Sequence, residues 1–111
     1  MELIPERGEI WWVSLDPTLG SEIRKTRPCV VISVSTLNAR RRTVIVVPLS
    51  SSPKPNPPLQ IPILCEGRQC VAVSDQIRVI AKERLRGRIG AASAEEMSAL
   101  EDGLRQIMRL G

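Results

Sequence analysis

RGEIWWVSLDPTLGSEIRKTRPCVVIS, residues 7–33, contains two apolar runs separated by a polar segment. The runs, Ile10–Leu15 and Cys29–Ser33, are rich in β-branched residues, and the first also contains two tryptophans, a composition typical of β-strands. Turn-forming residues at 16–21 end the first run. The pattern predicts two strands joined by a charged loop at 22–28, and such a loop on a rigid scaffold is a common place for functional residues.

Two features of this stretch place individual side chains. Pro28 fixes its own φ and favours an extended conformation for Arg27, so we expect Arg27 at the entrance of the second strand. Trp11 and Trp12 alternate across the first strand, so one faces the core and the other faces outward or towards a partner.

The remainder of the chain predicts short strands and turns. Further strands are expected at 43–49, 59–64, 70–73, 76–80 and 85–91, where 70–80 forms either a strand pair or one bent strand. A short helical turn is expected within 34–42, which ends in three arginines that are either solvated or in contact with phosphate. Four prolines exclude a helix or a central strand at 50–58 and indicate a surface loop.

The C-terminal segment has the signature of a helix. Ser93 and Glu96 form a capping box, in which the Ser93 hydroxyl accepts from the Glu96 amide and the Glu96 carboxylate reaches back. Apolar residues then recur at helical spacing and define the expected buried face: Met97, Leu100, Leu104, Ile107 and Met108. Many short strands followed by one helix favour an α+β fold, a small antiparallel barrel with a C-terminal helix packed on it.

Composition restricts the class of protein. At 111 residues the chain is expected to form a single domain, 1–111, and its core must be mainly aliphatic because Phe and Tyr are absent. The formal net charge of +4 favours an anionic partner. Nucleic acid fits better than a membrane, because the sequence shows neither a basic amphipathic helix nor an apolar run of about 18 residues.

Cysteine and histidine usage excludes several kinds of site. Three cysteines without CxxC spacing, in a chain that shows no signal peptide, argue against a disulfide framework and favour the cytoplasm. Because the chain has no histidine, a zinc site would need thiolates and carboxylates alone, so we expect no metal and no cofactor. Cys29 lies in an apolar strand and is expected in the core.

A series of short motifs resembles the MazF/PemK family of toxin endoribonucleases. They are GEIW at 8–11, DPT at 16–18, GSE at 20–22, TRP at 26–28, PLSS at 48–51 and SDQIR at 74–78. The resemblance covers nearly the whole chain. It implies an SH3-like barrel, a homodimer, sequence-specific cleavage of single-stranded RNA, and a MazE-like antitoxin as partner.

RNA carries its own nucleophile, the 2′-hydroxyl, so a cleaving enzyme must position the backbone, stabilise charge on the phosphorus and move two protons. Histidines usually move these protons, and their absence excludes a two-histidine ribonuclease. The guanidinium of Arg27 matches two phosphate oxygens and suits charge stabilisation. The resemblance assigns this role, together with acid catalysis, to Arg27 and implies metal-independent cleavage to a 2′,3′-cyclic phosphate and a 5′-hydroxyl.

Two further residues are candidates for the catalytic site. Family members carry a threonine at the end of the third strand, and Ser50 occupies that place here with its hydroxyl retained. Ser51 or Ser52 would replace it if the register were shifted, and the serines would otherwise form only a turn. Glu22 acts as a base, holds Arg27, or is an exposed loop charge.

RNA contacts are expected from Arg24, Lys25, Ser51, Lys54, Arg78 and Arg84. Surface solvation is the alternative for Arg78 and Arg84. Asp75 and Gln76 are expected to be a buried pair that satisfies loop amides. The outward tryptophan either stacks on a base or packs in an interface.

The competing hypothesis is a non-catalytic toxin or nucleic-acid-binding barrel that poisons a protein target, as toxins of the CcdB type do. Folds of this kind do not determine activity. The discriminating feature is Arg27 together with a hydroxyl at position 50, which a pure binder does not require.

Overall fold

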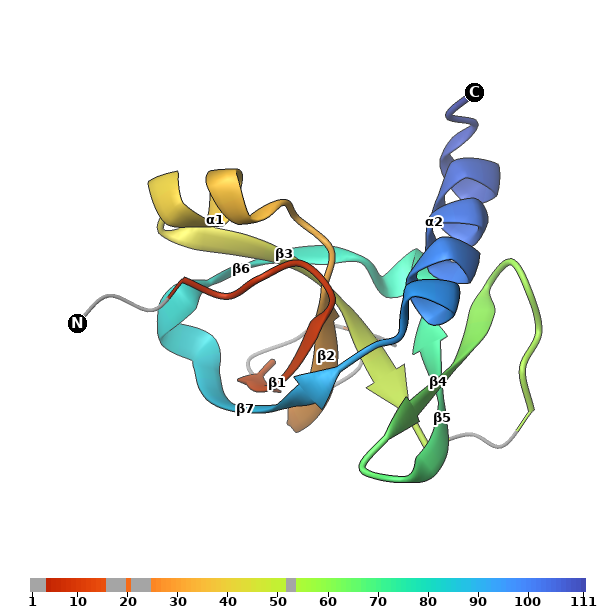
Figure 1. Cartoon of the computed structure of the whole chain (residues 1–111), viewed down its shortest axis with the longest axis horizontal. Coiled ribbons are helices and arrows are strands. Elements are labelled where there is room, and N and C mark those ends of the chain that lie inside the picture. Colours follow the sequence, from red (N-terminus) through yellow and green to blue (C-terminus); the bar gives the residue numbers. More distant parts are fainter. Residues whose placement is uncertain (1–3, 16–19, 21–24, 52–53) are drawn as a thin grey trace.

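The computed structural model describes residues 4–15, 20, 25–51 and 54–111. Its elements are β1 (Glu9–Ser14), β2 (Thr26–Val31), α1 (Ser35–Arg40), β3 (Thr43–Ser50), β4 (Gln60–Cys65), β5 (Arg68–Val73), β6 (Arg78–Ala81), β7 (Leu85–Ala91) and α2 (Ala94–Met108), with 3-10 turns at Ser74–Gln76 and Lys82–Arg84 (Figure 1). The predicted succession of short strands followed by one long C-terminal helix is confirmed.

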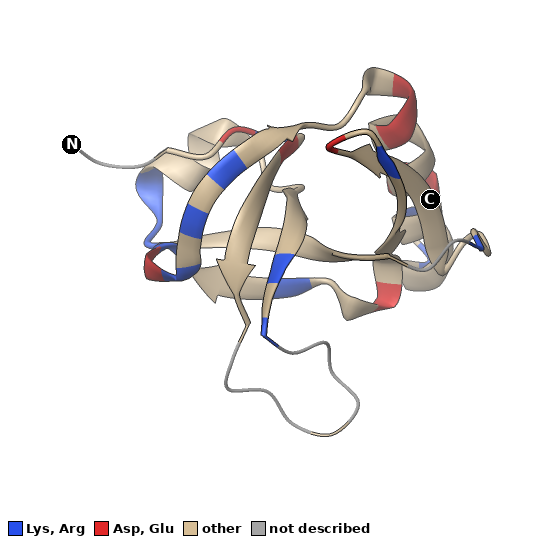
Figure 2. Ribbon diagram, turned by 90° about the horizontal axis from the view of Figure 1, so that it is seen from below, with Lys and Arg blue, Asp and Glu red and all other residues tan. Residues whose placement is uncertain are grey.

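The strands form one strongly curved antiparallel sheet in the order β4-β5-β3-β2-β1-β7. β6 also pairs with β3, and every strand pair among the described residues is antiparallel. Seen as in Figure 2, the sheet curls into a partly closed ring. This arrangement confirms the predicted small antiparallel barrel with a packed C-terminal helix.

β3 is the centre of the sheet because it meets three other strands. β2 pairs along one of its edges, and β6 and β5 pair in succession along the other. β5 and β6 do not pair with each other. They follow one another along the same edge of β3, and the 3-10 turn Ser74–Gln76 joins them. The stretch 70–80 therefore consists of two separate strands that pair one after the other with β3, and it is neither a hairpin nor one continuous strand.

Both faces of the central strands are buried. Leu49, Val47 and Val30 pack with Leu100 in one apolar cluster, next to β4 and α2. The alternate residues of β2 and β3 belong to a second cluster with Leu85: Cys29, Val31, Val44 and Val46. Burial on two faces explains why β3 is an almost continuous apolar run.

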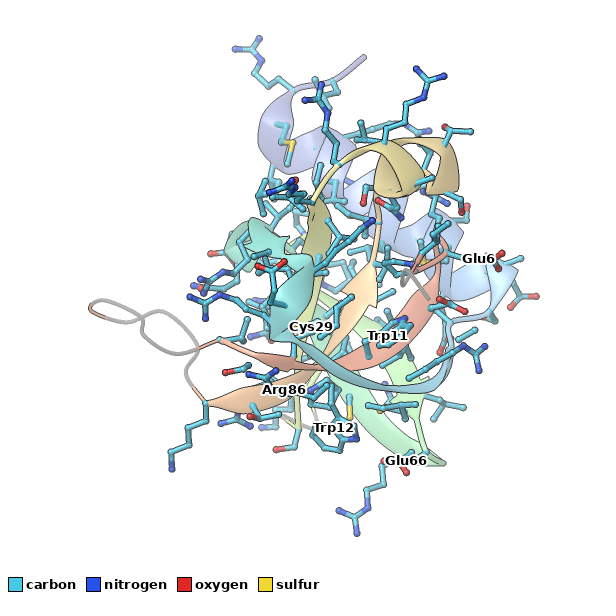
Figure 3. The ribbon with its side chains drawn as sticks, turned by 90° about the vertical axis from the view of Figure 1, so that its left-hand side faces the viewer. Glu6, Trp11, Trp12, Cys29, Glu66 and Arg86 are labelled. Atoms are coloured by element: carbon cyan, nitrogen blue, oxygen red, sulfur yellow. The ribbon has the colours of Figure 1, made fainter. Side chains whose placement is uncertain are left out.

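The two tryptophans of β1 lie on opposite faces of the sheet (Figure 3). Trp11 is 8% exposed and packs in the second apolar cluster, whereas Trp12 is 39% exposed. The predicted alternation is confirmed.

Glu9 at the start of β1 is held by several donors. Its carboxylate accepts from the Trp11 indole N–H at 3.1 Å, from the Glu6 amide at 2.8 Å and from Arg88 Nε at 2.7 Å. Burial acts to raise the pKa of Glu9, but these donors outweigh it and lower the pKa below the ordinary value of 4.5.

β2 begins earlier than the sequence predicted. Thr26, Arg27 and Pro28 were expected in the loop, but they pair with Ser14, Val13 and Trp12 of β1. Pro28 is tolerated because the β2–β3 ladder starts one residue later, at Cys29, so the missing N–H removes no bond to β3.

α2 begins as predicted. The Glu96 amide donates to Ser93 Oγ at 3.1 Å, and the Ser93 amide donates to Glu96 Oε1 at 2.9 Å. The other Glu96 oxygen accepts from the Leu64 amide at 2.7 Å, so the cap also holds the edge strand β4. β4 is the first strand in the sheet order and so lies at its edge, which explains how it accommodates Pro62.

The buried face of α2 differs from the prediction near its C-terminus. Met97 and Leu100 are buried, but Met108 is 41% exposed, because the last turn projects past the sheet (Figure 1). Gly103 is buried instead, where a backbone without Cβ lets the helix approach Pro58.

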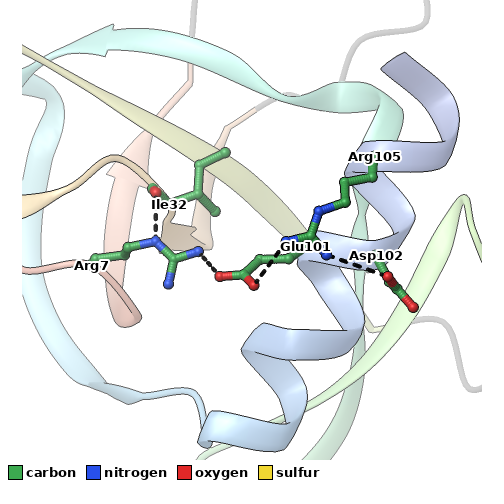
Figure 4. Close-up of polar contacts among 5 residues, drawn as sticks. All are labelled: Arg7, Ile32, Glu101, Asp102 and Arg105. Carbon is green, nitrogen blue, oxygen red and sulfur yellow. Dashed lines mark hydrogen bonds and ion pairs between the residues drawn. The ribbon is translucent and has the colours of Figure 1, made fainter. Parts of the chain in front are cut away.

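Polar contacts also join α2 to the N-terminal segment (Figure 4). Arg7 donates from Nε to the Ile32 carbonyl at 3.1 Å and forms an ion pair with Glu101. Arg105 lies 3.9 Å from Glu101 and 3.5 Å from Asp102. Such exposed pairs contribute little stability individually, about 0–1 kcal/mol. The two Arg105 pairs lie within α2, and only the Arg7–Glu101 pair joins segments that are distant in sequence.

Candidate active site

A cavity of about 510 Å³ opens where β3 ends. It is lined by Trp12, Arg27, Pro28, Leu49, Ser50, Ser51, Cys65, Glu66, Arg68 and Cys70. One wall comes from β1, β2 and the end of β3, and the other comes from the hairpin of β4 and β5. The cavity is therefore formed by segments that are far apart in the sequence.

Strand register brings Arg27 and Ser50 to this cavity. Cys29 pairs with Pro48, and two residues further along each strand the same register makes Arg27 level with Ser50. Ser50 also pairs with Val71 of β5, so it is the last residue of β3 held by the sheet. Both residues are partly buried, and both line the same cavity.

Ser51 also lines the cavity, but it is exposed and lies one residue beyond β3. The two serines therefore remain alternatives for the hydroxyl, with Ser50 the more firmly held. Ser52 and the two loop residues Glu22 and Arg24 lie outside the described residues.

Among the described residues, the other predicted RNA contacts do not line the cavity. Lys25 and Lys54 are exposed, next to β2 and in the loop after β3 respectively. Arg78 lies in β6 and pairs with Val46 of β3, and Arg84 donates from Nη1 to the Ser14 carbonyl at 3.1 Å. That bond satisfies the backbone at the end of β1, so the structure adds a structural role for Arg84.

Asp75 is exposed, and its predicted place in a buried Asp–Gln pair is wrong. It lies in the 3-10 turn between β5 and β6, and the buried side chain of that turn is Ser74.

Sequence reasoning missed the wall formed by the hairpin of β4 and β5. Its turn contains Glu66 and Gly67, both with positive φ (53° and 76°), as a tight two-residue hairpin requires. The turn itself was readable from the sequence. Curvature of the sheet then brings Glu66 and Arg68 to the same cavity as Arg27, and no local pattern encodes that curvature.

The three cysteines are free thiols in different environments. Cys29 is fully buried in the second apolar cluster, which confirms it as a core residue. This burial raises the pKa of its thiol to about 12, against a smaller lowering by Arg78. Burial also raises the pKa of Cys65, and the neighbouring Cys70 and Glu66 raise it further.

Within the described residues, no group of three or more Cys, Asp or Glu side chains is placed to hold a metal ion. In the same part of the chain, no helix is long and apolar enough to span a membrane.

Comparison with known proteins identifies the family. Residues 6–108 match the family model described as PemK-like, MazF-like toxin of type II toxin–antitoxin system. The chain is 42% identical over 108 residues to endoribonuclease MazF9 of Mycobacterium tuberculosis, with 89% of this chain and 92% of the relative covered. It is 33% identical over 100 residues to endoribonuclease toxin MazF of Escherichia coli, with 88% of each chain covered.

Solved structures show the same fold. MazF from Deinococcus radiodurans superposes with a TM-score of 0.87 at 21% identity, covering 98% of this chain and 100% of that one. A mycobacterial endoribonuclease solved in complex with its cognate antitoxin superposes with a TM-score of 0.79 at 18% identity, covering 96% and 97%. The barrel, its helices and the sequence match agree, and this chain belongs to the PemK-like, MazF-like toxin family of type II toxin–antitoxin systems.

Proposed function

We propose that this chain is a sequence-specific, metal-independent endoribonuclease that cleaves single-stranded RNA. The 2′-oxygen attacks the adjacent phosphorus, and the products are a 2′,3′-cyclic phosphate and a 5′-hydroxyl. One observation carries the proposal: Arg27 and Ser50 line the same cavity in a chain whose curated relatives are named endoribonucleases.

Arg27 is proposed to stabilise the charge that develops on the phosphoryl oxygens. Its guanidinium offers a planar fork of donors for two oxygens, and a partly buried position strengthens these interactions relative to water. The same group is proposed to supply the proton for the leaving 5′-oxygen. Arg27 lies in β2 and pairs with Val13 of β1, which holds its backbone before substrate arrives and provides the preorganisation that such catalysis needs.

Ser50 is proposed to donate its hydroxyl proton to a phosphate oxygen. It ends β3 with its backbone paired to Val71, whereas Ser51 lies beyond the strand. A matched pair of variants separates them: Ser50→Ala is expected to lower kcat more than Ser51→Ala does. The reverse order would assign the hydroxyl to Ser51.

Glu22 is proposed either to accept the 2′-hydroxyl proton or to hold Arg27. A Glu22→Gln variant separates these roles through its pH–rate profile, because loss of the base removes the acidic limb of the profile. A positioning role would lower the rate and keep that limb.

The RNA backbone is proposed to be attracted by Lys25, Lys54 and Arg24. Ser51, Arg78 and Arg84 are proposed as further contacts, although Arg84 also donates to the Ser14 carbonyl. Trp12 lines the cavity with 39% of its surface exposed, and it is proposed as a surface for stacking an unpaired base.

A MazE-like antitoxin and a second copy of the chain are the proposed partners. Structural relatives include MazE–MazF complexes from Deinococcus radiodurans and the mycobacterial complex described above. The net charge of +4 would accept an acidic antitoxin segment that orders on binding. We place the toxin in the cytoplasm, where its RNA substrate is found.

The test is incubation of the purified chain with a long single-stranded RNA in EDTA, followed by mapping of the cut ends. Arg27→Ala is expected to lose roughly 10²–10³-fold in rate, and Arg27→Lys should recover part of it because the charge returns without the fork. Arg105→Ala is the control, since it removes the same side chain from α2. Cleavage that requires a divalent ion, or full activity of folded Arg27→Ala, would overturn the proposal.

The second candidate is the non-catalytic toxin. A folded wild-type protein that makes no cuts in any RNA tested would favour it.

A further inference from the structure

Two cysteines lie together in the wall of the candidate RNA cavity. Cys65 ends β4 and Cys70 lies in β5, and both line the cavity that also contains Arg27 and Ser50. In the hairpin register Cys65 pairs with Arg68 and Cys70 pairs with Ile63. Cys70 is thus two residues beyond the partner of Cys65, which places both thiols on the same face of the hairpin.

The spacing is that of diagonal neighbours across two antiparallel strands, whose Cα atoms are about 7–8 Å apart. A disulfide needs a Cα separation of up to about 6.8 Å. A movement of about 1 Å would close that gap. The hairpin end can supply it, because only the turn Glu66-Gly67 lies beyond Cys65 and β4 is an edge strand.

We propose that Cys65 and Cys70 form a redox-active dithiol in the cavity wall, which a small disulfide oxidant converts into an intramolecular disulfide that inhibits RNA cleavage. The inhibitory part rests on the proposed ribonuclease function, whereas formation of the disulfide does not. The site is separate from the groups proposed for the chemistry, and it would couple the toxin to the thiol–disulfide balance of its surroundings.

Exposure determines the order of the two steps. Cys70 is partly exposed, so its thiolate attacks the oxidant RSSR first, giving a Cys70 mixed disulfide and releasing one RS⁻. Cys65 is only 6% exposed; it then loses its proton to solvent, and its thiolate attacks the sulfur of Cys70, releasing the second RS⁻. Two protein thiols are oxidised by two electrons, and the oxidant is reduced to two thiols.

The closing step should be slow at neutral pH and accelerate as pH rises. Burial raises the pKa of Cys65, so little of it is thiolate at neutral pH, and each increase in pH adds more of the attacking form. Cys29 is fully buried in the second apolar cluster and should take no part.

Closing the disulfide would displace Arg68 and Glu66. Both lie between the two cysteines and both line the cavity. Because a shift of about 1 Å at a substrate site can cost up to roughly 10²-fold in rate, we expect at least a roughly tenfold loss of cleavage.

The experiment treats the whole chain with glutathione disulfide and reads it by intact mass, peptide mapping and RNA cleavage. The expected product has lost two hydrogen atoms, contains a Cys65–Cys70 cross-linked peptide and regains its activity with dithiothreitol. Cys29→Ser should behave as wild type. In Cys70→Ser no cross-link should form, and in Cys65→Ser the reaction should stop at a glutathione adduct on Cys70.

Three outcomes would overturn the proposal: no cross-link in the wild type, a stable adduct on Cys70 beside a free Cys65, or a cross-link that leaves cleavage unchanged. Each variant is compared with its own reduced form. If the reduced wild type does not cut RNA, the ribonuclease proposal fails, and the mass readout still decides whether the dithiol closes.

Discussion

Gly103 provides a sharp test of how α2 packs on the barrel. It lies inside the helix, where replacement of glycine by alanine normally stabilises a protein by about 1 kcal/mol. Here a Cβ would lie 2.8 Å from the Pro58 carbonyl oxygen and 3.3 Å from Ile61 Cδ1. The oxygen belongs to the backbone, so it cannot rotate away as a flexible side chain would.

The two effects oppose each other, and their magnitudes determine the sign. Overpacking of a close contact costs about 1–3 kcal/mol, against the gain of about 1 kcal/mol in helix propensity. We therefore expect Gly103→Ala to destabilise the fold by about 1 kcal/mol, a fall in Tm of roughly 4 °C for a domain of this size.

The measurement is thermal and urea unfolding of Gly103→Ala beside Ser98→Ala, an exposed position on the same helix. The control should be unchanged or slightly stabilised. A Gly103→Ala variant more stable than wild type would refute the close approach of α2 to Pro58.

Three further predictions follow from single contacts. Ser93→Ala removes the cap of α2 and should lower the unfolding free energy by about 1 kcal/mol in a thermal melt, whereas an unchanged melt would contradict the capping box. The pKa of Glu9 is lower in the folded state than the ordinary 4.5, so its carboxylate stabilises the fold above that pH and the contribution disappears as pH falls through the folded value. Urea titrations of wild type and Glu9→Gln should therefore differ most near neutrality and converge in acid, and a constant difference would contradict the shift. Arg68→Ala should raise KM for RNA with little change in kcat, because Arg68 is an exposed residue that lines the cavity from the β4–β5 hairpin and is not among the groups proposed for the chemistry. A fall in kcat as large as the fall in kcat/KM would assign it to the chemistry instead.

Local patterns in the sequence were sufficient for most of the secondary structure. The capping box at Ser93, the alternation of Trp11 and Trp12, and the strand at 85–91 all involve residues within a few positions of one another. Propensity and periodicity act over that range, which is why these predictions were confirmed. The start of β2 was missed because Thr26, Arg27 and Pro28 have loop-forming neighbours, and only pairing with β1 makes them a strand.

By itself, the sequence determined the order of the elements, the aliphatic core and the identity of Arg27 and Ser50 as candidates. Only the tertiary structure decided that these two residues share a cavity with the hairpin of β4 and β5, that Arg7 meets Glu101, and that α2 packs through Gly103. Register and sheet curvature control these contacts, and both arise from packing of the whole chain, since side chains distant in sequence must fill one core at close-packed density.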